Sequence, residues 1–140
     1  KEISTILGLD REYKMVIVGT GNLGQALANY TKYYKLGFPI IGMFDVNPKI
    51  IGLRINDIEV MDSENLLDFL NSNHVDIGII TTDKAAAQSV ANKLVEGGVR
   101  GIWNFAPCDL KVPKNVPVEN VHVTDTLNSL VYHIIHAEDD

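Results

Sequence analysis

Residues 14–24 read Lys-Met-Val-Ile-Val-Gly-Thr-Gly-Asn-Leu-Gly, and this stretch decides the fold. Residues 14–18 form a short β-rich run that predicts a buried strand, and Gly19 ends it. Apolar residues then recur at the spacing of a helix, at Leu23, Leu27, Tyr30 and Tyr34. The stretch therefore predicts a strand, a tight turn and a helix in succession.

The same alternation continues along the chain. Further strand patterns occupy Phe38–Phe44, Ile58–Met61, Val75–Ile80, Gly101–Phe105 and Val118–Val123. One helix pattern opens with Ser63 and Glu64. A second follows a cap at Asp83 and ends at Gly97 and Gly98, and a third follows a cap at Thr124 or Asp125. Strands that are apolar on both faces and separated by helices indicate a parallel sheet covered on both sides. We therefore predict an α/β fold of the Rossmann type, with a doubly wound, mostly parallel sheet.

Length and composition fit one domain over residues 1–140. With 46% apolar and 21% charged residues, the composition is neither that of a disordered chain nor that of a membrane protein. The net charge is −6 and the lysines and arginines do not cluster, so this chain is a poor candidate for direct contact with DNA or RNA. A single cysteine and the lack of a secretory signal favour the cytoplasm. The first residue is Lys1 rather than Met, so we expect the sequence to be part of a longer protein.

Three glycines fit the G-x-G-x-x-G fingerprint of dinucleotide-binding domains, in the required place between a strand and a helix. Gly19 permits the tight turn, Gly21 leaves room for a pyrophosphate, and Gly24 lets the helix approach the strand closely. The free N–H groups and the positive dipole end of the helix that opens at Asn22 would receive the phosphates. The alternative is a fold whose glycines only pack the helix against the strand.

The fingerprint also requires an acid at the end of the next strand. Asp45 meets this requirement, 21 residues after Gly24. Its carboxylate is expected to accept hydrogen bonds from the adenosine ribose hydroxyls. A 2′-phosphate would bring negative charge against Asp45, so the sequence favours NAD over NADP.

Later strands add candidates, because ligands of this fold bind beyond the carboxyl ends of the strands. Thr81 and Thr82 either offer hydroxyls to the ribose or pyrophosphate or simply end their strand. The run Asn104, Phe105, Ala106 and Pro107 lies where a nicotinamide would point, and its apolar members suit the ring. Trp103 is expected to belong to the core, close enough to report on a bound cofactor.

Enzymatic hydride transfer to a carbonyl usually needs a proton donor, and the sequence offers poor candidates. His74 precedes a strand, at the end away from the site, and His122 ends the last strand. His133 and His136 lie three residues apart on the last helix, without an acidic or cysteine partner for a metal. Cys108 is either a small buried hydrophobe or an oxidation-sensitive thiol. We therefore predict no catalytic residue, no metal site and no enzymatic activity.

The last helix pattern carries a complete apolar stripe, formed by Leu127, Leu130, Val131, Ile134 and Ile135. This stripe either packs on the sheet of its own domain or forms a contact between subunits. Its position at the end of the chain makes exchange of the helix between subunits feasible.

Longer segments are similar to one known family. They are residues 16–27 (VIVGTGNLGQAL), 44–48 (FDVNP), 86–88 (AAQ), 94–95 (LV), 97–107 (GGVRGIWNFAP) and 118–121 (VENV). These segments resemble the redox-sensing transcriptional repressors of the Rex family. The Gly-Ile-x-Asn-Phe-Ala-Pro part is much more specific than the glycine fingerprint, and the resemblance covers nearly the whole chain.

The resemblance implies a sensor of the NADH/NAD+ ratio, in which NADH binding releases a homodimeric repressor from operator DNA. The DNA would be bound by an N-terminal winged-helix domain that is absent from this chain, and residues 1–12 would be the remaining linker. Residues 124–140 would form a dimerisation helix that is swapped into the partner subunit.

Carried over position by position, the resemblance assigns a cofactor site. The pyrophosphate would lie against Gly19, Gly21, Asn22, Leu23 and Gly24, the adenosine ribose against Asp45, and the nicotinamide side against residues 104–107. Thr20 and Val46 adjoin these positions and belong to the predicted site. Tyr30 matches a tyrosine that takes part in the redox switch of some members. The sequence departs from the family at His122, where the partner acid is expected, and at Thr81-Thr82-Asp83, where Thr-Val-Pro is usual.

Three other functions remain as alternatives. A small NAD-dependent oxidoreductase would need an acid or base and a substrate domain that the sequence does not offer. A nucleotide-binding domain of the CoA-binding type shares the sheet and the glycine turn, but Asp45 suits a dinucleotide ribose with free hydroxyls. A purely structural dimerisation module would bind no nucleotide.

Overall fold

The computed structural model describes residues 12–29, 36–121 and 123–139. The strands are β1 Met15–Val18, β2 Ile40–Asp45, β3 Arg54–Ile55, β4 Ile58–Asp62, β5 Ile77–Ile80, β6 Gly101–Asn104 and β7 Val118–Asn120. The helices are α2 Asn22–Ala28, α4 Leu66–Ser72, α5 Lys84–Glu96 and α6 Val123–Asp139, with a 3-10 helix, η1, at Ser63–Asn65. The predicted linker at residues 1–12 lies outside the described residues except for Glu12, and so do Tyr30 and Tyr34.

The described strands form one sheet in the order β3-β4-β2-β1-β5-β6-β7. The pairs from β4 across to β7 are parallel, and β3 runs antiparallel to β4. The chain starts in the middle at β1, moves outward through β2 and β4, and then crosses back to β5 on the other side of β1. This reversal places the topological switch point between β1 and β5. The predicted Rossmann-type fold is confirmed.

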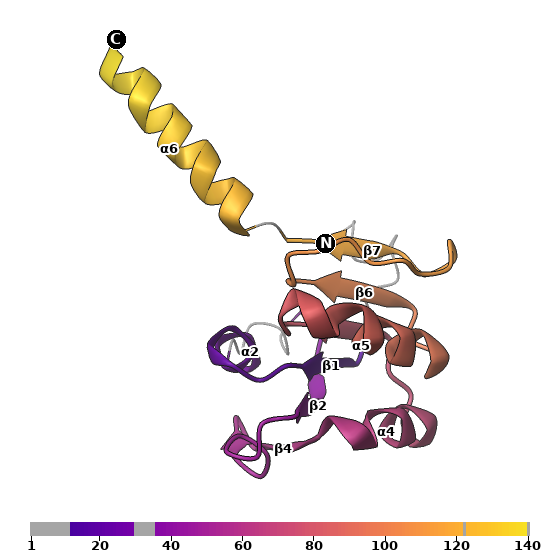
Figure 1. Cartoon of the computed structure of the whole chain (residues 1–140). Coiled ribbons are helices and arrows are strands. Elements are labelled where there is room, and N and C mark those ends of the chain that lie inside the picture. Colours follow the sequence, from indigo (N-terminus) through magenta and orange to yellow (C-terminus); the bar gives the residue numbers. More distant parts are fainter. Residues whose placement is uncertain (1–11, 30–35, 122, 140) are drawn as a thin grey trace.

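Helices cover both faces of the sheet because alternate residues of each strand point to opposite sides. Val18 packs in one core with Leu70 of α4 and Leu94 of α5. Ile17 packs in a second core with Ala28 of α2. Figure 1 shows α2 on one side of the strands and α4 and α5 on the other. The sheet is therefore doubly wound, as predicted.

Two helix starts test the predicted capping residues. Asp83 caps α5, since its Oδ1 accepts a hydrogen bond from the Ala86 N–H at 3.1 Å. At the preceding helical segment the cap is Asp62, whose Oδ1 accepts from the Glu64 N–H at 2.9 Å. The helical segment thus begins at Ser63, as predicted, and its first turn is 3-10 rather than α-helical.

The structure shortens several predicted strands. The strand expected from Phe38 begins at Ile40, and the strand expected from Val75 begins at Ile77. The amides of Asp76 and Ile77 both donate to the Lys14 carbonyl, so the regular ladder starts only at Ile77.

At the carboxyl end of the chain, two further bounds differ. The predicted strand Gly101–Phe105 ends at Asn104, and the one predicted over Val118–Val123 ends at Asn120. α6 begins at Val123, ahead of the caps expected at Thr124 or Asp125.

The antiparallel strand β3 is not among the predicted elements. Asn56 and Asp57 have φ values of 51° and 69°, and they connect β3 to β4. Two consecutive residues in the left-handed region make the type of turn that joins hairpin strands. The Asn-Asp pair is the local signal for this hairpin, and it lies between two apolar residues, Ile55 and Ile58.

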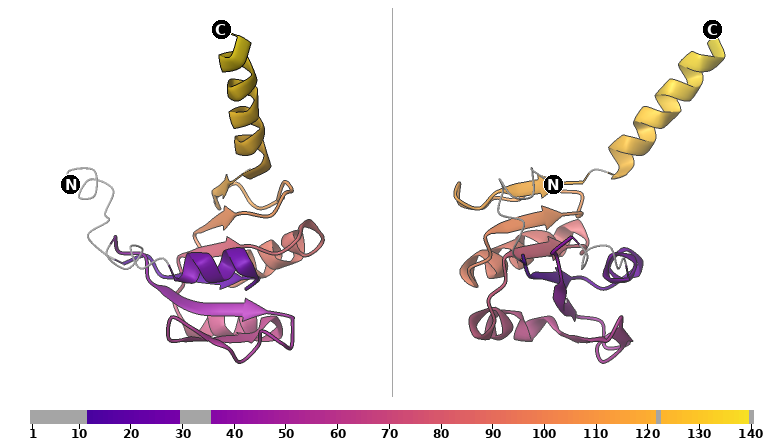
Figure 2. Two further views of the ribbon diagram at one scale, coloured as in Figure 1. Left: turned by 90° about the vertical axis from the view of Figure 1, so that its left-hand side faces the viewer. Right: turned by 180° about the vertical axis from the view of Figure 1, so that it is seen from behind.

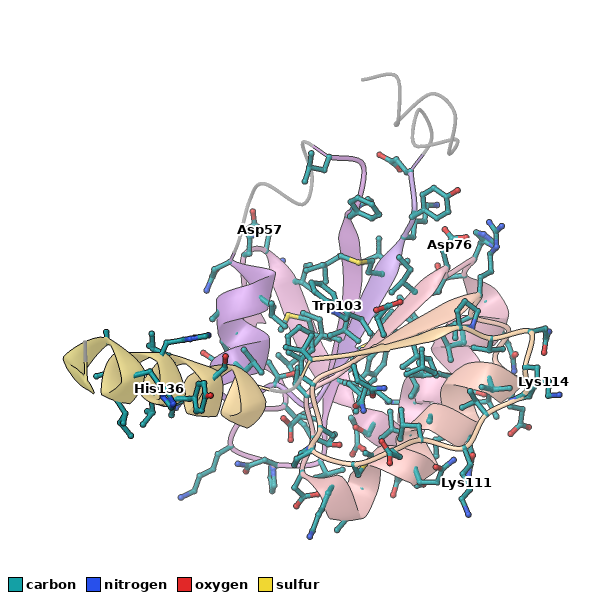
Figure 3. The ribbon with its side chains drawn as sticks, turned by 90° about the horizontal axis from the view of Figure 1, so that it is seen from above. Asp57, Asp76, Trp103, Lys111, Lys114 and His136 are labelled. Atoms are coloured by element: carbon teal, nitrogen blue, oxygen red, sulfur yellow. The ribbon has the colours of Figure 1, made fainter. Side chains whose placement is uncertain are left out.

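A buried carboxylate ties the amino ends of three strands together. Asp76, whose side chain is 3% exposed, accepts a hydrogen bond from the Lys14 N–H at 2.9 Å. Its other oxygen lies 2.8 Å from His74 Nε2 and 3.6 Å from an Arg100 nitrogen. The Asp76 carbonyl accepts from the amides of Arg100 and Gly101. Figure 3 shows Asp76 at one end of the sheet, opposite the end where a ligand is expected.

Helix α2 and the other described residues leave part of the α2 side of the sheet open. Between β6 and β7 the chain forms a loop instead of a helix, and a hollow of about 390 Å³ lies over this part of the sheet. Its wall is largely apolar and includes Met15, Phe38, Ile77 and Trp103. The described residues therefore leave an apolar part of the sheet uncovered.

α6 projects from the end of β7 away from the sheet (Figures 1 and 2). Its predicted apolar stripe is exposed: Leu127 58%, Leu130 55%, Val131 46%, Ile134 49% and Ile135 51%. The stripe therefore does not pack on the sheet of its own chain, which was one of the two alternatives. Within the described residues, no helix combines the length and the apolar character that a bilayer crossing requires.

The contact between β5 and α5 can be tested with a pair of glycines. A Cβ at Gly78 would lie 2.6 Å from Leu94 Cδ1, and Leu94 is fully buried. We expect Gly78→Ala to lower the free energy of unfolding by about 1–3 kcal/mol, because overpacking strains the core. The measurement is urea denaturation followed by Trp103 fluorescence.

Gly101→Ala is the matched control. A Cβ at Gly101 would meet the Pro117 carbonyl oxygen at 3.6 Å, an ordinary contact. Its stability should change by less than about 1 kcal/mol. Equal losses for the two variants would contradict the assigned packing of β5 against α5.

Candidate dinucleotide-binding site

The strand order brings the predicted site residues to one edge of the sheet. The glycine turn after β1 lies between Asp45, which ends β2, and Thr81 and Thr82, which follow β5. Asn104 ends the next strand, β6, and the loop of residues 105–108 follows it. Because these strands are parallel, all of these groups lie at the carboxyl edge, around the switch point between β1 and β5.

Two of the glycines are needed by the protein itself. Gly19 has φ +97°, and a Cβ there would lie 2.8 Å from the Thr82 nitrogen. A Cβ on Gly24 would overlap the Gly19 carbonyl oxygen. The predicted roles of these two residues, the tight turn and the close approach of helix to strand, agree with this geometry.

Gly21 differs from the other two, because no atom of the described residues lies within 4 Å of the position its Cβ would take. It is the N-cap of α2, with φ −82°, and its carbonyl accepts from the Gln25 N–H at 2.9 Å. The first N–H groups of a helix have no partner within the helix, and Gly21 has no side chain to cap them. Open space before such N–H groups fits a pyrophosphate.

Asp45, the residue predicted to bind the ribose, also holds the glycine turn. Its Oδ2 accepts a hydrogen bond from the Thr20 N–H at 2.5 Å. Its Oδ1 accepts from the amides of Val46 at 2.7 Å and Asn47 at 2.9 Å. A carboxylate has about four acceptor positions, so Asp45 can still accept from a ligand hydroxyl. Val46, 77% exposed, offers an apolar surface beside it.

Thr20 itself is buried and does not face a ligand with its side chain. Its Oγ1 donates to the Phe44 carbonyl at 3.1 Å, and the Gly19 N–H donates to the same carbonyl at 2.8 Å. Thr20 therefore fixes the turn to β2. Asn22 and Leu23, by contrast, are both exposed at the start of α2.

The two threonines after β5 have different positions. The Thr81 hydroxyl donates to the carbonyls of Val18 and Gly19, so its proton is used to join β5 to the glycine turn. The Thr82 hydroxyl donates to the Asp83 carbonyl at 3.0 Å. Both hydroxyls thus donate to backbone carbonyls, as expected for residues that end a strand. Each hydroxyl oxygen can still accept a hydrogen bond from a ligand.

The segment after β6 divides into buried and accessible residues. Asn104 is 0% exposed and Ala106 is 2% exposed, so neither side chain can form an extensive surface for a ring. Phe105 is half-buried and Pro107 is exposed, which leaves these two as the apolar contacts. The Trp103 and Phe105 rings have centroids 4.8 Å apart, so Trp103 packs beside the segment. Figure 3 shows Trp103 over the middle of the sheet.

The other predicted candidates lie away from this edge. His74 is at the amino end of the sheet, beside Asp76. His133 and His136 lie on α6, and the described residues contain no group of three or more side chains placed to hold a metal ion. Cys108 is half-buried at the end of the loop after β6. His122 lies outside the described residues.

Two residues that the sequence did not single out hold segments beside the predicted site. Asn120, at the end of β7, accepts a hydrogen bond from Asn104 Nδ2 at 2.9 Å. Gln88 of α5 forms two hydrogen bonds with the backbone of Lys111, at 2.8 and 2.9 Å, and so holds the loop before β7. Asn120 could have been found by applying the strand-end rule to the last strand. Gln88 gives no comparable signal, because its partner is 23 residues away.

Known proteins are similar to this chain over most of its length. The model of the CoA binding domain family matches residues 10–108. The redox-sensing transcriptional repressor Rex of Clostridium botulinum (strain Eklund 17B) is 54% identical over 133 residues, which are 95% of this chain and 63% of that protein. The chain thus spans less than two thirds of the length of this relative.

Solved structures of RSP, a Rex-family repressor, have the same fold. The complex with beta-NADH superposes with a TM-score of 0.91 at 50% identity, covering 98% of this chain and 66% of the other. The complex of RSP with beta-NAD+ and operator DNA has a TM-score of 0.92 at 50% identity, covering 98% and 63%. The chain therefore belongs to the CoA binding domain family, and its relationship to the Rex repressors extends over nearly its whole length.

Proposed function

We propose that this chain is the NADH-sensing regulatory domain of a cytoplasmic transcriptional repressor. The observation that carries the proposal is the Asp45 carboxylate, which holds the Thr20 amide of the glycine turn beside an open position at Gly21. This arrangement suits a dinucleotide with free ribose hydroxyls better than a coenzyme that carries a phosphate on its ribose. Relatives that are repressors, one of them solved with NADH and with NAD+ plus operator DNA, support the same function.

Each part of the cofactor has a group to receive it. Gly21 and the start of α2 would bind the pyrophosphate, and Asp45 would bind the adenosine ribose. Phe105 and Pro107 would line the nicotinamide. When bound, the cofactor supplies only a redox-dependent charge, because NAD+ has a positive ring and NADH a neutral one. An apolar surface disfavours the charged ring, so NADH binds more tightly.

The regulatory output requires a second subunit. We propose a homodimer in which α6 leaves its own sheet and packs on the partner chain. The support is the exposed stripe of α6 together with the uncovered apolar hollow on the sheet. Since a ligand shifts an equilibrium only by its differential affinity, NADH and NAD+ would favour different arrangements of the two subunits. Operator DNA would be bound by a domain outside this chain.

A titration with NADH, followed by energy transfer from Trp103 to the reduced nicotinamide, tests the cofactor site. We expect binding without turnover, and weaker binding of NAD+. Gly21→Ala should weaken NADH binding at least about tenfold while leaving the melting temperature unchanged, because its Cβ meets cofactor but no protein atom. Gly24→Ala should lower both the NADH affinity and the melting temperature, because its Cβ collides with the Gly19 carbonyl. Full NADH affinity in Gly21→Ala would contradict the site.

Asp45 should set the preference for the unphosphorylated cofactor. We expect NADPH to bind at least about tenfold more weakly than NADH, because its 2′-phosphate meets the carboxylate. In Asp45→Asn the ratio of the two dissociation constants should shrink, since the amide has no charge. An unchanged ratio, measured by calorimetry, would show that the ribose lies elsewhere.

The oligomeric state tests the assignment of α6. The parent chain should sediment as a dimer, and Leu130→Asp with Ile134→Asp should convert it to a monomer, because the charges would have to be buried. Ser129→Asp places the same charge on an exposed position beside the stripe and should leave the dimer intact. A stripe variant that stays dimeric would exclude α6 from the interface.

A further inference from the structure

The fully buried side-chain amide of Asn104 lies between the loop of residues 105–108 and β7, the strand that precedes α6. Asn104 ends β6, and its Oδ1 accepts a hydrogen bond from the Ala106 N–H at 3.0 Å. Its Nδ2 lies within hydrogen-bond distance of the carbonyls of Ala106 at 3.2 Å and Cys108 at 3.1 Å, and of Asn120 Oδ1 at 2.9 Å. We call Asn104 and Asn120 the asparagine pair.

The Asn104 amide nitrogen has fewer protons than neighbouring acceptors, and this links its partners to one another. A side-chain amide nitrogen carries two protons, but Nδ2 of Asn104 faces three acceptors. Two of these acceptors belong to the loop, and the third belongs to β7. A shift of either loop carbonyl therefore changes how the protons are shared with Asn120. The Asn104 amide is fully buried and must keep protein acceptors, whereas Asn120 is exposed and its oxygen can bond water instead.

The same residue also holds the backbone from which α6 starts. The Asn104 carbonyl accepts a hydrogen bond from the Val121 N–H at 2.8 Å. In the parallel register of β6 and β7, Asn104 lies beside Asn120. α6 begins at Val123, two residues after Val121, and extends away from the sheet (Figure 2). A change in the contacts of Asn104 therefore acts on the end of the strand that leads into α6.

We propose that Asn104 is a positioning residue that couples the nicotinamide side of the site to α6 through the asparagine pair. This inference rests on the proposed function, because it places the nicotinamide beside residues 105–107. Accommodation of the neutral ring moves the loop carbonyls, Asn104 redistributes its hydrogen bonds, and Asn120 changes the base of α6. The signal thus reaches α6 within one chain.

Hydrogen–deuterium exchange of the whole chain, with and without saturating NADH, tests the coupling. In the parent chain NADH should slow exchange in residues 105–110 and also change it in residues 123–131. In Asn120→Ala the response of residues 105–110 should persist, and the response of residues 123–131 should be lost. The dissociation constant for NADH should stay within about threefold, because Asn120 contributes only one exposed acceptor.

Two further variants separate coupling from structural damage. Asn120→Asp keeps an oxygen that can accept from Asn104 and should restore the response of α6. Asn92→Ala removes an acceptor of the same kind on α5, where Gln88 Nε2 donates to Asn92 Oδ1 at 2.9 Å, and should leave both responses intact. Loss of the α6 response in the rescue variant Asn120→Asp would overturn the proposal.

The remaining outcomes are also decisive. An α6 response that survives in Asn120→Ala, or that is missing in the parent chain while residues 105–110 are protected, overturns the coupling and leaves the proposed function standing. No protection by NADH anywhere would refute the proposed function itself, and the coupling with it.

Discussion

The hydrogen bond between the Thr20 amide and the Asp45 carboxylate is the contact around which the site is organised. It joins the turn after β1 to the end of β2, at 2.5 Å, and the same carboxylate shapes the turn that follows β2. The Thr81 hydroxyl secures the other side of the turn from β5. Three parallel strands thus hold one backbone segment whose open side is Gly21. The acid proposed to bind the ribose also holds the turn proposed to bind the pyrophosphate, so the two proposed subsites are fixed together.

Apart from β3, the order of the elements and the architecture were accessible from the sequence, because local patterns determine them. Apolar runs alternate with helical periodicity, and Gly19 and Gly24 serve the turn and the close packing that the fingerprint requires. The cap at Asp83 was likewise accessible, because its partner amide lies three residues away. The bounds of the strands were less accessible, since they depend on where a neighbouring strand ends. The strand pattern that starts at Val75, for example, begins two residues before the pairing with β1, which starts at Ile77.

The least predictable features of the site are those that depend on distant partners. Asn104 belongs to a segment whose place near the nicotinamide was predicted, but its side chain faces inward to Asn120, 16 residues later. Thr81 was a candidate ligand and proves to bond carbonyls 62 and 63 residues earlier. A polar residue at a strand end can face the ligand or the protein, and its sequence neighbours do not distinguish the two. Burial, which is a property of the assembled fold, makes the distinction.

The attachment of α6 has a mechanical consequence. A helix of 17 residues is about 25 Å long, and this one leaves the sheet at a single end. It therefore acts as a lever: a rotation of about 10° at its base would move its tip by about 4 Å, as far as a helix advances in nearly one turn. A rearrangement of hydrogen bonds too small to alter the sheet is in this way amplified into a displacement that a neighbouring molecule can register.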